Sequence, residues 1–228
     1  MKTVPKVRLL QSTDLPVCAT AIRTCWDSHE KATPDGDIKL IHRVGVGNNH
    51  ASTLEHMVYS FYISDISRAL LQELARHRIA SFSVKSTRYC LKELLACNAF
   101  HTMTPEVDEA NNLSITHEYN QADADKYLVW TDVDEVDKAS MRALESLRQC
   151  VVNKIPNDKA KFCLPDSLKT ELTFTINARS LRNFLSLRTS KAAMWEIRTL
   201  AHGIHNTLPD AHKYLYEDVV TILPDKDK

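Results

Sequence analysis

Glycine is scarce in this sequence, with only four among 228 residues. So few glycines argue against a glycine-rich phosphate-binding loop, and against an all-β fold built from many tight turns. Gly45 and Gly47 begin a segment that looks like a dinucleotide-binding fingerprint, but His50 stands where the third glycine would be. We therefore expect an ordinary loop there.

An excess of charge of one sign is also missing. Lys and Arg total 29, Asp and Glu total 29, and the formal net charge is zero. The chain therefore has no overall positive field to attract nucleic acid or an anionic membrane, and an anion site must come from local clustering. We also find no signal peptide and no apolar run long enough to span a bilayer, so we expect a cytoplasmic protein.

The cysteines lack the spacing of a zinc site or of a CxxC motif. Six occur, at positions 18, 25, 90, 97, 150 and 163, and none stands at zinc-like spacing from a pair of histidines. Reduced, buried thiols in a cytosolic protein are the favoured interpretation. We predict no metal site.

What is present is the pattern of a single mixed domain spanning 1–228, without repeats or linkers. Apolar periodicity predicts strands at 6–10, 57–63 and 168–178, and helices at 14–26, 37–44, 66–78, 134–154, 180–187 and 192–208. Ser64 and Asp65 are the expected N-cap of the third of these helices. Residues 101–118 look polar and loop-like, and the charged tail 224–228 is expected to be flexible.

Two stretches contain basic residues and no acidic ones. Residues 75–92 hold five bases and interleaved hydroxyls, and residues 178–195 hold four bases. Guanidinium groups with hydroxyls suit a phosphate ester. The alternative from charge alone is a solvated basic face, balanced by the acidic stretch 123–137.

The spacing within the first stretch is more specific than its charge. Arg76-His77-Arg78 is followed by seven residues and then Ser86. This pattern is the signature of the flavin-dependent thymidylate synthases (ThyX family), which the sequence resembles. Further matches are His50-Ala-Ser-Thr-Leu-Glu-His56, the segment 160–165 with Lys161 in place of a usual arginine, and 177–188. The matched blocks run from 50 to 196, and 101–140 is a family-variable segment.

The resemblance implies a fold and a reaction. The expected fold class is α+β: a single mixed α/β domain with a largely antiparallel central sheet flanked by helices, assembling as a homotetramer. The implied reaction is reductive methylation of dUMP to dTMP, with 5,10-methylenetetrahydrofolate giving the carbon and reduced FAD giving the hydride. NADPH reduces the FAD. The flavin and folate carry the hard chemistry, so the protein mainly binds, orients and polarises.

The resemblance also assigns residues. Those implied to contact FAD are His50, Ser52, Arg76, His77, Arg78, Asn177, Arg179 and Asn183. Those implied to bind dUMP are Glu73, Arg76, Ser86, Thr87, Arg88, Lys161 and Arg188. We predict that Arg188 is catalytic, because a fixed cation at the uracil edge favours loss of the N3 proton. The alternative for Arg188 is packing, or pairing with Glu196.

Two other functions remain open from the sequence. One is a nucleic-acid-binding module that uses the basic stretches, although only Phe82 and Tyr89 supply the interleaved aromatic residues that RNA binding favours. The other is a flavoprotein of the same fold that acts on another nucleotide. Cys90 stands beside the motif, but nothing in the sequence activates it, so we expect a buried thiol and not a nucleophile.

Overall fold

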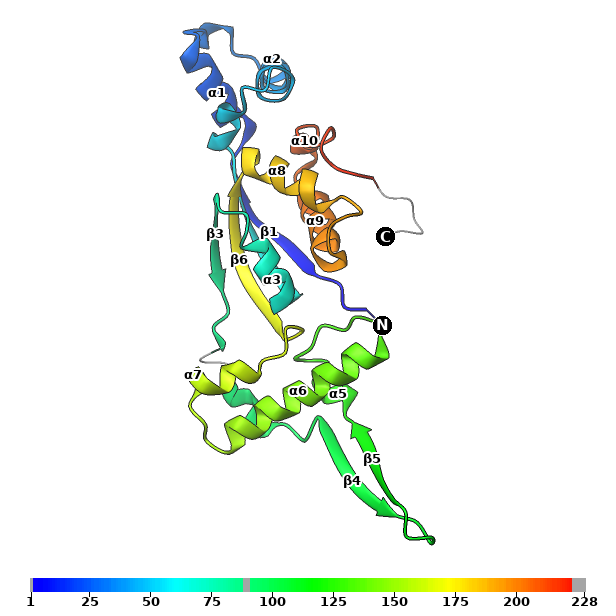
Figure 1. The fold of residues 1–228 in the computed structure, drawn as a ribbon. Helices are drawn as coiled ribbons and strands as arrows, with labels where there is room; N and C mark the ends of the chain where they lie inside the picture. The colour runs from blue at the N-terminus through cyan, green and yellow to red at the C-terminus, as the bar shows by residue number, and fades with distance from the viewer. Residues whose placement is uncertain (1, 88–90, 223–228) are drawn as a thin grey trace. The chain divides into compact units, whose positions relative to one another are not determined.

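The computed structural model describes residues 2–87 and 91–222, and its contacts divide the chain into two compact units (Figure 1). The sheet unit comprises Val4–Ser64, Leu70–Val84 and Glu171–Lys228. The hairpin unit comprises Met1–Thr3, Asp65–Ala69 and Lys85–Thr170. The single domain over 1–228 stays a prediction. The tail 224–228, Arg88 and Cys90 lie outside the described residues.

The sheet unit mixes strands with helices, as expected. Its four-stranded sheet has the order β1-β2-β6-β3, with bounds Lys6–Ser12, Val58–Ser67, Lys169–Asn177 and Ala80–Val84. Its helices are α1 Leu15–Cys25, α2 Pro34–Ile41, α3 Arg68–Leu74, α8 Ala178–Arg188, α9 Trp195–Thr207 and α10 Asp210–Lys213. β1 runs antiparallel to β2, and β3 antiparallel to β6. The expected antiparallel pairing is confirmed for these strands.

The core of the sheet unit forms where the central strands meet α8. Alternate side chains of β6 are fully or nearly fully buried, among them Phe174. The ring of Phe174 lies 6.2 Å from the ring of Phe184, and Leu181 and Leu185 on the same helix are also buried. This packing fixes α8 against the sheet, and α9 packs in turn against α8 and β1. Phe184 is fully buried in this core.

The predicted helix 66–78 is shorter at both ends than expected. β2 continues through Ser67, so Ser64 and Asp65 lie in a strand and do not cap a helix, and α3 runs only from Arg68 to Leu74. Asp65 has a φ of 57°, a left-handed backbone that interrupts the regular strand. Ile66 is a buried residue of β2, and its four-residue spacing from Leu70 resembles the spacing of a buried helical face.

Other boundaries also differ from the sequence-based expectation. A π-helical turn, His42–Gly47, extends α2, and a 3₁₀ helix at Ala51–His56 occupies part of the expected loop after Gly45. β3 has no counterpart among the predicted strands, because its exposed serines and half-buried apolar residues lie within a basic stretch.

The hairpin unit shows the clearest correction. Residues 101–118, expected to be a loop, form an antiparallel hairpin of β4 His101–Val107 and β5 Leu113–Tyr119. Apart from its two end residues, this ribbon is exposed on both faces. Its apolar residues do alternate with polar ones, as Leu113 and Ile115 do in β5, but the polar composition of the segment led to the loop prediction. Its turn is held by the Asp108 carboxylate, which accepts from the N–H groups of Ala110 and Asn112.

The helices of the hairpin unit surround a small apolar core. They are α5 Gln121–Ala124, α6 Asp134–Val152 and α7 Asn157–Ala160. α6 confirms the predicted helix at 134–154, and its buried residues include Met141, Leu144 and Leu147. None of the described helices combines the length and apolarity that a membrane crossing requires.

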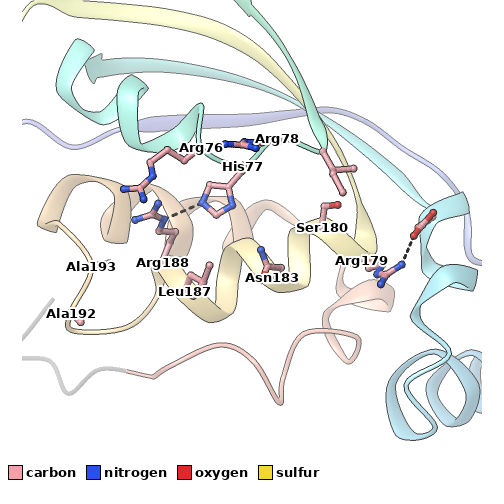
Figure 2. Close-up of a pocket in the computed structure, with 12 residues that line it drawn as sticks. Arg76, His77, Arg78, Arg179, Ser180, Asn183, Leu187, Arg188, Ala192 and Ala193 are labelled. Atoms are coloured by element: carbon pink, nitrogen blue, oxygen red, sulfur yellow. Dashed lines mark hydrogen bonds and ion pairs between the residues drawn. The ribbon is translucent and has the colours of Figure 1, made fainter.

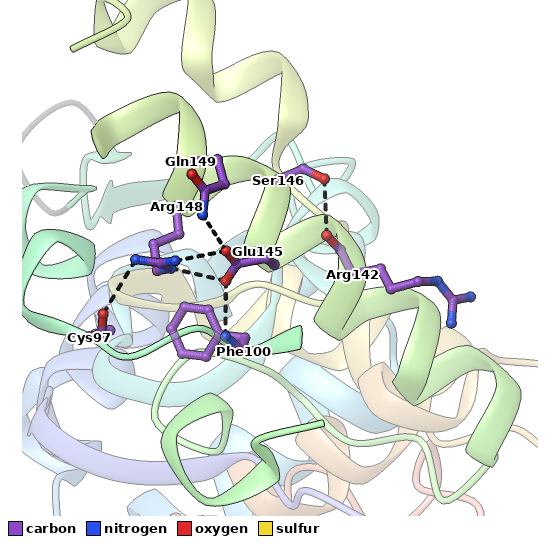
Figure 3. Close-up of polar contacts among 7 residues, drawn as sticks. All are labelled: Cys97, Phe100, Arg142, Glu145, Ser146, Arg148 and Gln149. Atoms are coloured by element: carbon purple, nitrogen blue, oxygen red, sulfur yellow. Dashed lines mark hydrogen bonds and ion pairs between the residues drawn. The ribbon is translucent and has the colours of Figure 1, made fainter. Parts of the chain in front are cut away.

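A buried carboxylate ties α6 to the chain before the hairpin (Figure 3). Glu145 accepts the backbone N–H of Phe100 at 2.9 Å and the side-chain amide of Gln149 at 2.7 Å. It also accepts two bonds from Arg148, from Nε at 2.9 Å and from Nη2 at 2.8 Å. These donors hold the pKa of Glu145 below its usual range, although burial acts in the opposite direction as the largest single influence. The carboxylate is therefore charged and satisfied inside the unit.

Candidate functional site

The RHR motif lies in a tight turn between α3 and β3. The backbone N–H of Arg76 donates to the carbonyl of Glu73, and that of His77 to the carbonyl of Leu74. These bonds end the helix and hold the three consecutive basic side chains of the motif in one turn. Arg76 and Arg78 are exposed, whereas His77 is half-buried.

The first part of the second basic stretch forms α8, whose last residue, Arg188, contacts His77 in this turn. Asn177 caps the helix, because its side-chain oxygen accepts the backbone N–H of Ser180 at 2.8 Å. Arg179, Asn183 and Leu187 follow at four-residue intervals and therefore lie along one face. All three line the same cavity as the residues of the RHR turn (Figure 2).

The turn and the helix enclose an open cavity of about 840 Å³ within the sheet unit (Figure 2). Its lining residues are Glu55, Arg76, His77, Arg78, Ile79, Arg179, Ser180, Asn183, Leu187, Arg188, Ala192 and Ala193. Four arginines and one glutamate therefore line it. A cavity of this size with an excess of guanidinium groups is suited to a large anionic ligand.

Arg188 is held in this cavity by two residues from the α3 end. Its Nε–H donates to Nε2 of His77 at 3.0 Å, and its Nη1 donates to Oε2 of Glu73 at 3.0 Å. A weaker contact of 3.4 Å joins Nη2 to the Glu73 carbonyl. Only 16% of the Arg188 side chain is exposed, so the guanidinium is fixed in place. These contacts support a positioned cation more than the packing role considered from sequence.

His77 is a neutral hydrogen-bond acceptor in this arrangement. Its ring lies edge-on to Phe184 at 4.9 Å. Burial, followed by the charges of Arg188 and Arg76, lowers the pKa of His77 to about 4. Because an arginine N–H can only donate, Nε2 of His77 must be unprotonated and the proton must reside on Nδ1.

The other arginines differ in how firmly they are held. Arg76 lies 3.6 Å from Glu73, but 73% of its side chain is exposed. Arg179 pairs with Glu55 at 2.6 Å, with about half of each side chain exposed. Exposed ion pairs of this kind contribute little to stability. Both guanidinium groups can therefore turn to a ligand at small cost.

His50 and Ser52 lie at a second, smaller cavity. It has a volume of about 400 Å³ and is lined by Asn49, His50, Ala51, Ser52, Arg179 and Arg182. Arg179 lines both cavities, so the structure brings the upstream histidine block to the same region as α8. All eight residues predicted to contact FAD thus belong to the sheet unit.

The predicted dUMP ligands are divided between the two units. Glu73, Arg76 and Arg188 belong to the sheet unit and lie together, as described. Ser86, Thr87 and Lys161 belong to the hairpin unit, where Ser86 and Lys161 are exposed and Thr87 is half-buried. Lys161 begins the 3₁₀ helix Lys161–Cys163. Arg88 lies outside the described residues.

Several cavity residues were not predicted as ligands. They include Glu55, Ile79, Ser180, Leu187 and Ala193. Helical spacing from Arg179 and Asn183 could have identified Leu187, and the pairing of Glu55 with a cation 124 residues away in sequence could not have been found. No cluster of three or more potential metal ligands occurs in the described part of the chain.

Comparisons with known proteins identify the family. The family model described as "Thymidylate synthase complementing protein" matches residues 8–212. A flavin-dependent thymidylate synthase of Wolinella succinogenes is 55% identical over 215 residues, covering 92% of this chain and 96% of that protein. This chain belongs to the flavin-dependent thymidylate synthase family. A family member from Helicobacter pylori is 46% identical over 209 residues, covering 90% of this chain and 94% of that protein.

Solved structures of the family agree with the fold. A crystal structure of thymidylate synthase X from Helicobacter pylori with FAD and dUMP superposes with a TM-score of 0.84 at 43% identity. The match covers 96% of this chain and all of that one. The resemblance drawn from the RHR motif is therefore confirmed, and the enzyme interpretation is preferred to the nucleic-acid-binding alternative.

Proposed function

We propose that this flavin-dependent thymidylate synthase methylates dUMP to dTMP, with FAD as cofactor, 5,10-methylenetetrahydrofolate as carbon donor and NADPH as reductant. The observation that carries the proposal is the cationic cavity formed by the RHR turn and α8. Most of its lining residues come from two of the sequence blocks that resemble the family, the RHR motif and 177–188. The relatives' names and the FAD and dUMP of the solved Helicobacter pylori structure support the same assignment.

The chemistry of the cavity fits FAD. The pyrophosphate of FAD needs cationic or N–H donors, and the scarcity of glycine leaves side chains to supply them. Arg76, Arg78 and Arg179 line the cavity and can meet a phosphate at small cost, and Asn183 and Ser180 add uncharged polar groups. We assign FAD binding to these residues, together with His77, Asn177, His50 and Ser52. When bound, FAD supplies hydride chemistry that no side chain can provide.

The role of Arg188 follows from its fixed contacts. An arginine has five N–H donors, and three of them contact His77 or Glu73 among the described residues. Two donors therefore remain for a substrate. A guanidinium held against the uracil edge stabilises the anion left when N3 loses its proton, without reorganising as that charge develops.

His77 and Glu73 have distinct supporting roles. Neutral His77 orients the guanidinium without cancelling its charge, whereas Glu73 anchors it and partly neutralises it. The second carboxylate oxygen of Glu73 lies near Arg76, so one acid positions both cations. The phosphate of dUMP is assigned to Ser86, Thr87, Arg88 and Lys161.

We also propose assembly as a homotetramer that holds FAD between subunits. The support is the pair of cationic blocks, about a hundred residues apart in sequence, in a chain whose zero net charge allows self-association. Light scattering of the FAD-loaded protein tests this. A monomer with full FAD occupancy would contradict it.

Tritium release from C5-labelled dUMP tests the reaction. Loss of the C5 hydrogen to water should require FAD, NADPH and methylenetetrahydrofolate together. If the protein is instead a flavoprotein that acts on another nucleotide, the label should stay on dUMP, and a different substrate should oxidise the reduced flavin. Tritium release that does not depend on FAD would contradict the proposal.

A further inference from the structure

Two cysteines of the hairpin unit lie side by side at its surface. The Sγ atoms of Cys150 and Cys163 are 3.9 Å apart. Cys150 is half-buried near the end of α6, and Cys163 is exposed at the end of the 3₁₀ helix Lys161–Cys163. The proposed activity uses neither thiol.

The backbone explains why residues thirteen apart in sequence meet. After α6, Lys154 adopts a φ of 59°, and the N–H of Ile155 donates back to the carbonyl of Cys150 at 2.9 Å. The chain therefore reverses, and α7 and the following 3₁₀ helix return to the end of α6. The approach of the two sulfurs is set by this reversal.

We propose that Cys150 and Cys163 are a peroxide-reactive pair that closes into a reversible disulfide bond. A disulfide requires a sulfur separation of about 2.05 Å, so the two atoms must approach by roughly 1.9 Å. Rotation of a cysteine side chain between staggered positions moves its sulfur by at least about that distance. Cys163, on a single exposed turn, has room to make the movement.

The chemistry balances with hydrogen peroxide as the oxidant. The exposed Cys163 thiolate attacks one peroxide oxygen, the O–O bond breaks, and the products are a sulfenic acid on Cys163 and hydroxide, which takes up a proton to form water. The sulfur of Cys150 then attacks the sulfenic sulfur, an S–S bond forms, and hydroxide leaves with the Cys150 proton as water. Two electrons pass from the two sulfurs to one peroxide. A thiol such as dithiothreitol reverses the bond by exchange.

The half-buried position of Cys150 suits the second step. Burial, and the neighbouring Cys163 sulfur, raise the pKa of the Cys150 thiol. Because the thiolate is the reactive form, the raised pKa slows the reaction of Cys150 with dissolved peroxide, whereas the 3.9 Å separation of the sulfurs lets its thiolate fraction capture the sulfenic acid on Cys163.

The bridge would change the segment that carries Lys161. Lys161 and Cys163 share one 3₁₀ helix, so drawing Cys163 toward α6 shifts or restrains the lysine. This consequence rests on the proposed function, in which Lys161 contacts the phosphate of dUMP. We infer that the bridged protein binds dUMP with an affinity different from that of the reduced protein.

Peptide mapping of the intact enzyme tests the bridge independently of activity. The enzyme is treated with hydrogen peroxide, alkylated and digested. The Cys150 and Cys163 peptides should then appear joined, with a mass about two units below the sum of the two free-thiol peptides, and dithiothreitol should release both peptides. In Cys150→Ser, Cys163 should instead advance to sulfinic acid, because no second thiol captures the sulfenic acid. Cys25, which is also exposed, is the internal control for a thiol without this neighbour.

The result that would overturn the proposal is sulfinic acid on Cys163 in the wild-type enzyme with no joined peptide. Titration of the same samples with dUMP tests the link to Lys161: a changed affinity that dithiothreitol reverses supports it, and equal affinities in a fully bridged sample overturn it. Tritium release by the reduced enzyme is measured alongside. Its absence would count against the proposed function, whereas the joined peptide alone decides whether the bridge forms.

Discussion

The Nε–H of Arg188 donates to Nε2 of His77 across 3.0 Å, so the last residue of α8 is joined to the middle of the RHR motif. The two residues are 111 apart in sequence. A protonated histidine could not accept this bond, and the lowered pKa of His77 agrees with the geometry. The result is a cation whose direction is set by a neutral partner.

Replacing Arg188 tests the central assignment. Arg188→Ala should reduce turnover by about a hundredfold or more, as loss of a comparable electrostatic group does in other enzymes. Arg188→Lys should also be impaired, because an ammonium cannot reproduce the planar fork that contacts both His77 and Glu73. FAD content should persist, since other arginines line the cavity.

The control for this experiment is Arg142→Ala, an arginine on α6 outside the cavity lining. Its turnover should match the wild type. A fully active Arg188→Ala enzyme would refute the catalytic role. FAD occupancy is measured in each sample, so that a loss of cofactor is separated from a loss of chemistry.

The titration of His77 should report on Arg188 directly. In the wild type, histidine NMR resonances should show a pKa of about 4 for His77. Arg188→Gln removes a repelling cation and should raise this pKa, whereas Glu73→Gln removes an attracting charge and should lower it further. His77→Gln assigns the resonance. A wild-type His77 that titrates near its ordinary value would show that the contact with Arg188 is wrong.

The same shift makes a prediction about stability. Because the folded pKa is lowered, the unfolded chain binds a proton at His77 that the folded chain does not, between pH of about 6.5 and about 4. The contribution of neutral His77 to the free energy of unfolding is complete above the pKa of the unfolded chain and is lost as the pH falls through this window. Denaturant unfolding should therefore show a smaller decline over this range in His77→Gln than in the wild type. Equal declines would mean that His77 is not buried as described.

The sequence predicted the sheet unit better than the hairpin unit, for a physical reason. Strands that pack on a core alternate between buried and exposed residues, as β6 does, and this pattern is visible in the sequence. β4 and β5 also alternate, but their apolar residues, such as Leu113 and Ile115, are exposed and pack on no core. The many polar and charged residues around them therefore outweighed the alternation in the prediction.

Site residues that belong to a motif with fixed spacing could be predicted from the sequence, whereas side-chain contacts between distant segments could not. The RHR motif and the α8 block indicated Arg76, His77 and Arg188 through resemblance to a family. The contacts of Arg179 with Glu55, and of Arg188 with His77 and Glu73, join segments more than a hundred residues apart in sequence. No local pattern encodes those contacts, so only the structure shows them.

Lys161 is assigned to the phosphate of dUMP, and its replacement should affect nucleotide binding selectively. A charge-assisted contact contributes roughly 1.5–3 kcal/mol, so Lys161→Ala should weaken dUMP binding on the order of tenfold to a hundredfold and leave FAD bound. Arg88→Ala should behave in the same way. Lys159→Ala is a matched control, because it removes the same exposed charge two residues earlier. Isotherms of the Lys161 and Arg88 variants that overlay the wild type would show that this assignment is wrong.

Glu145 should dominate the stability of the hairpin unit. Its carboxylate accepts from the Phe100 N–H and from Arg148, and only 11% of its side chain is exposed. Glu145→Ala leaves the Arg148 charge and a backbone donor without their partner, so the free energy of unfolding should fall by about 3–5 kcal/mol, as for other broken buried pairs. Asp134→Ala removes an exposed pair with Lys138 on the same helix and should cost no more than about 1 kcal/mol. Urea unfolding of both variants measures the difference. Equal losses would show that the Glu145 contacts contribute no more than a surface ion pair.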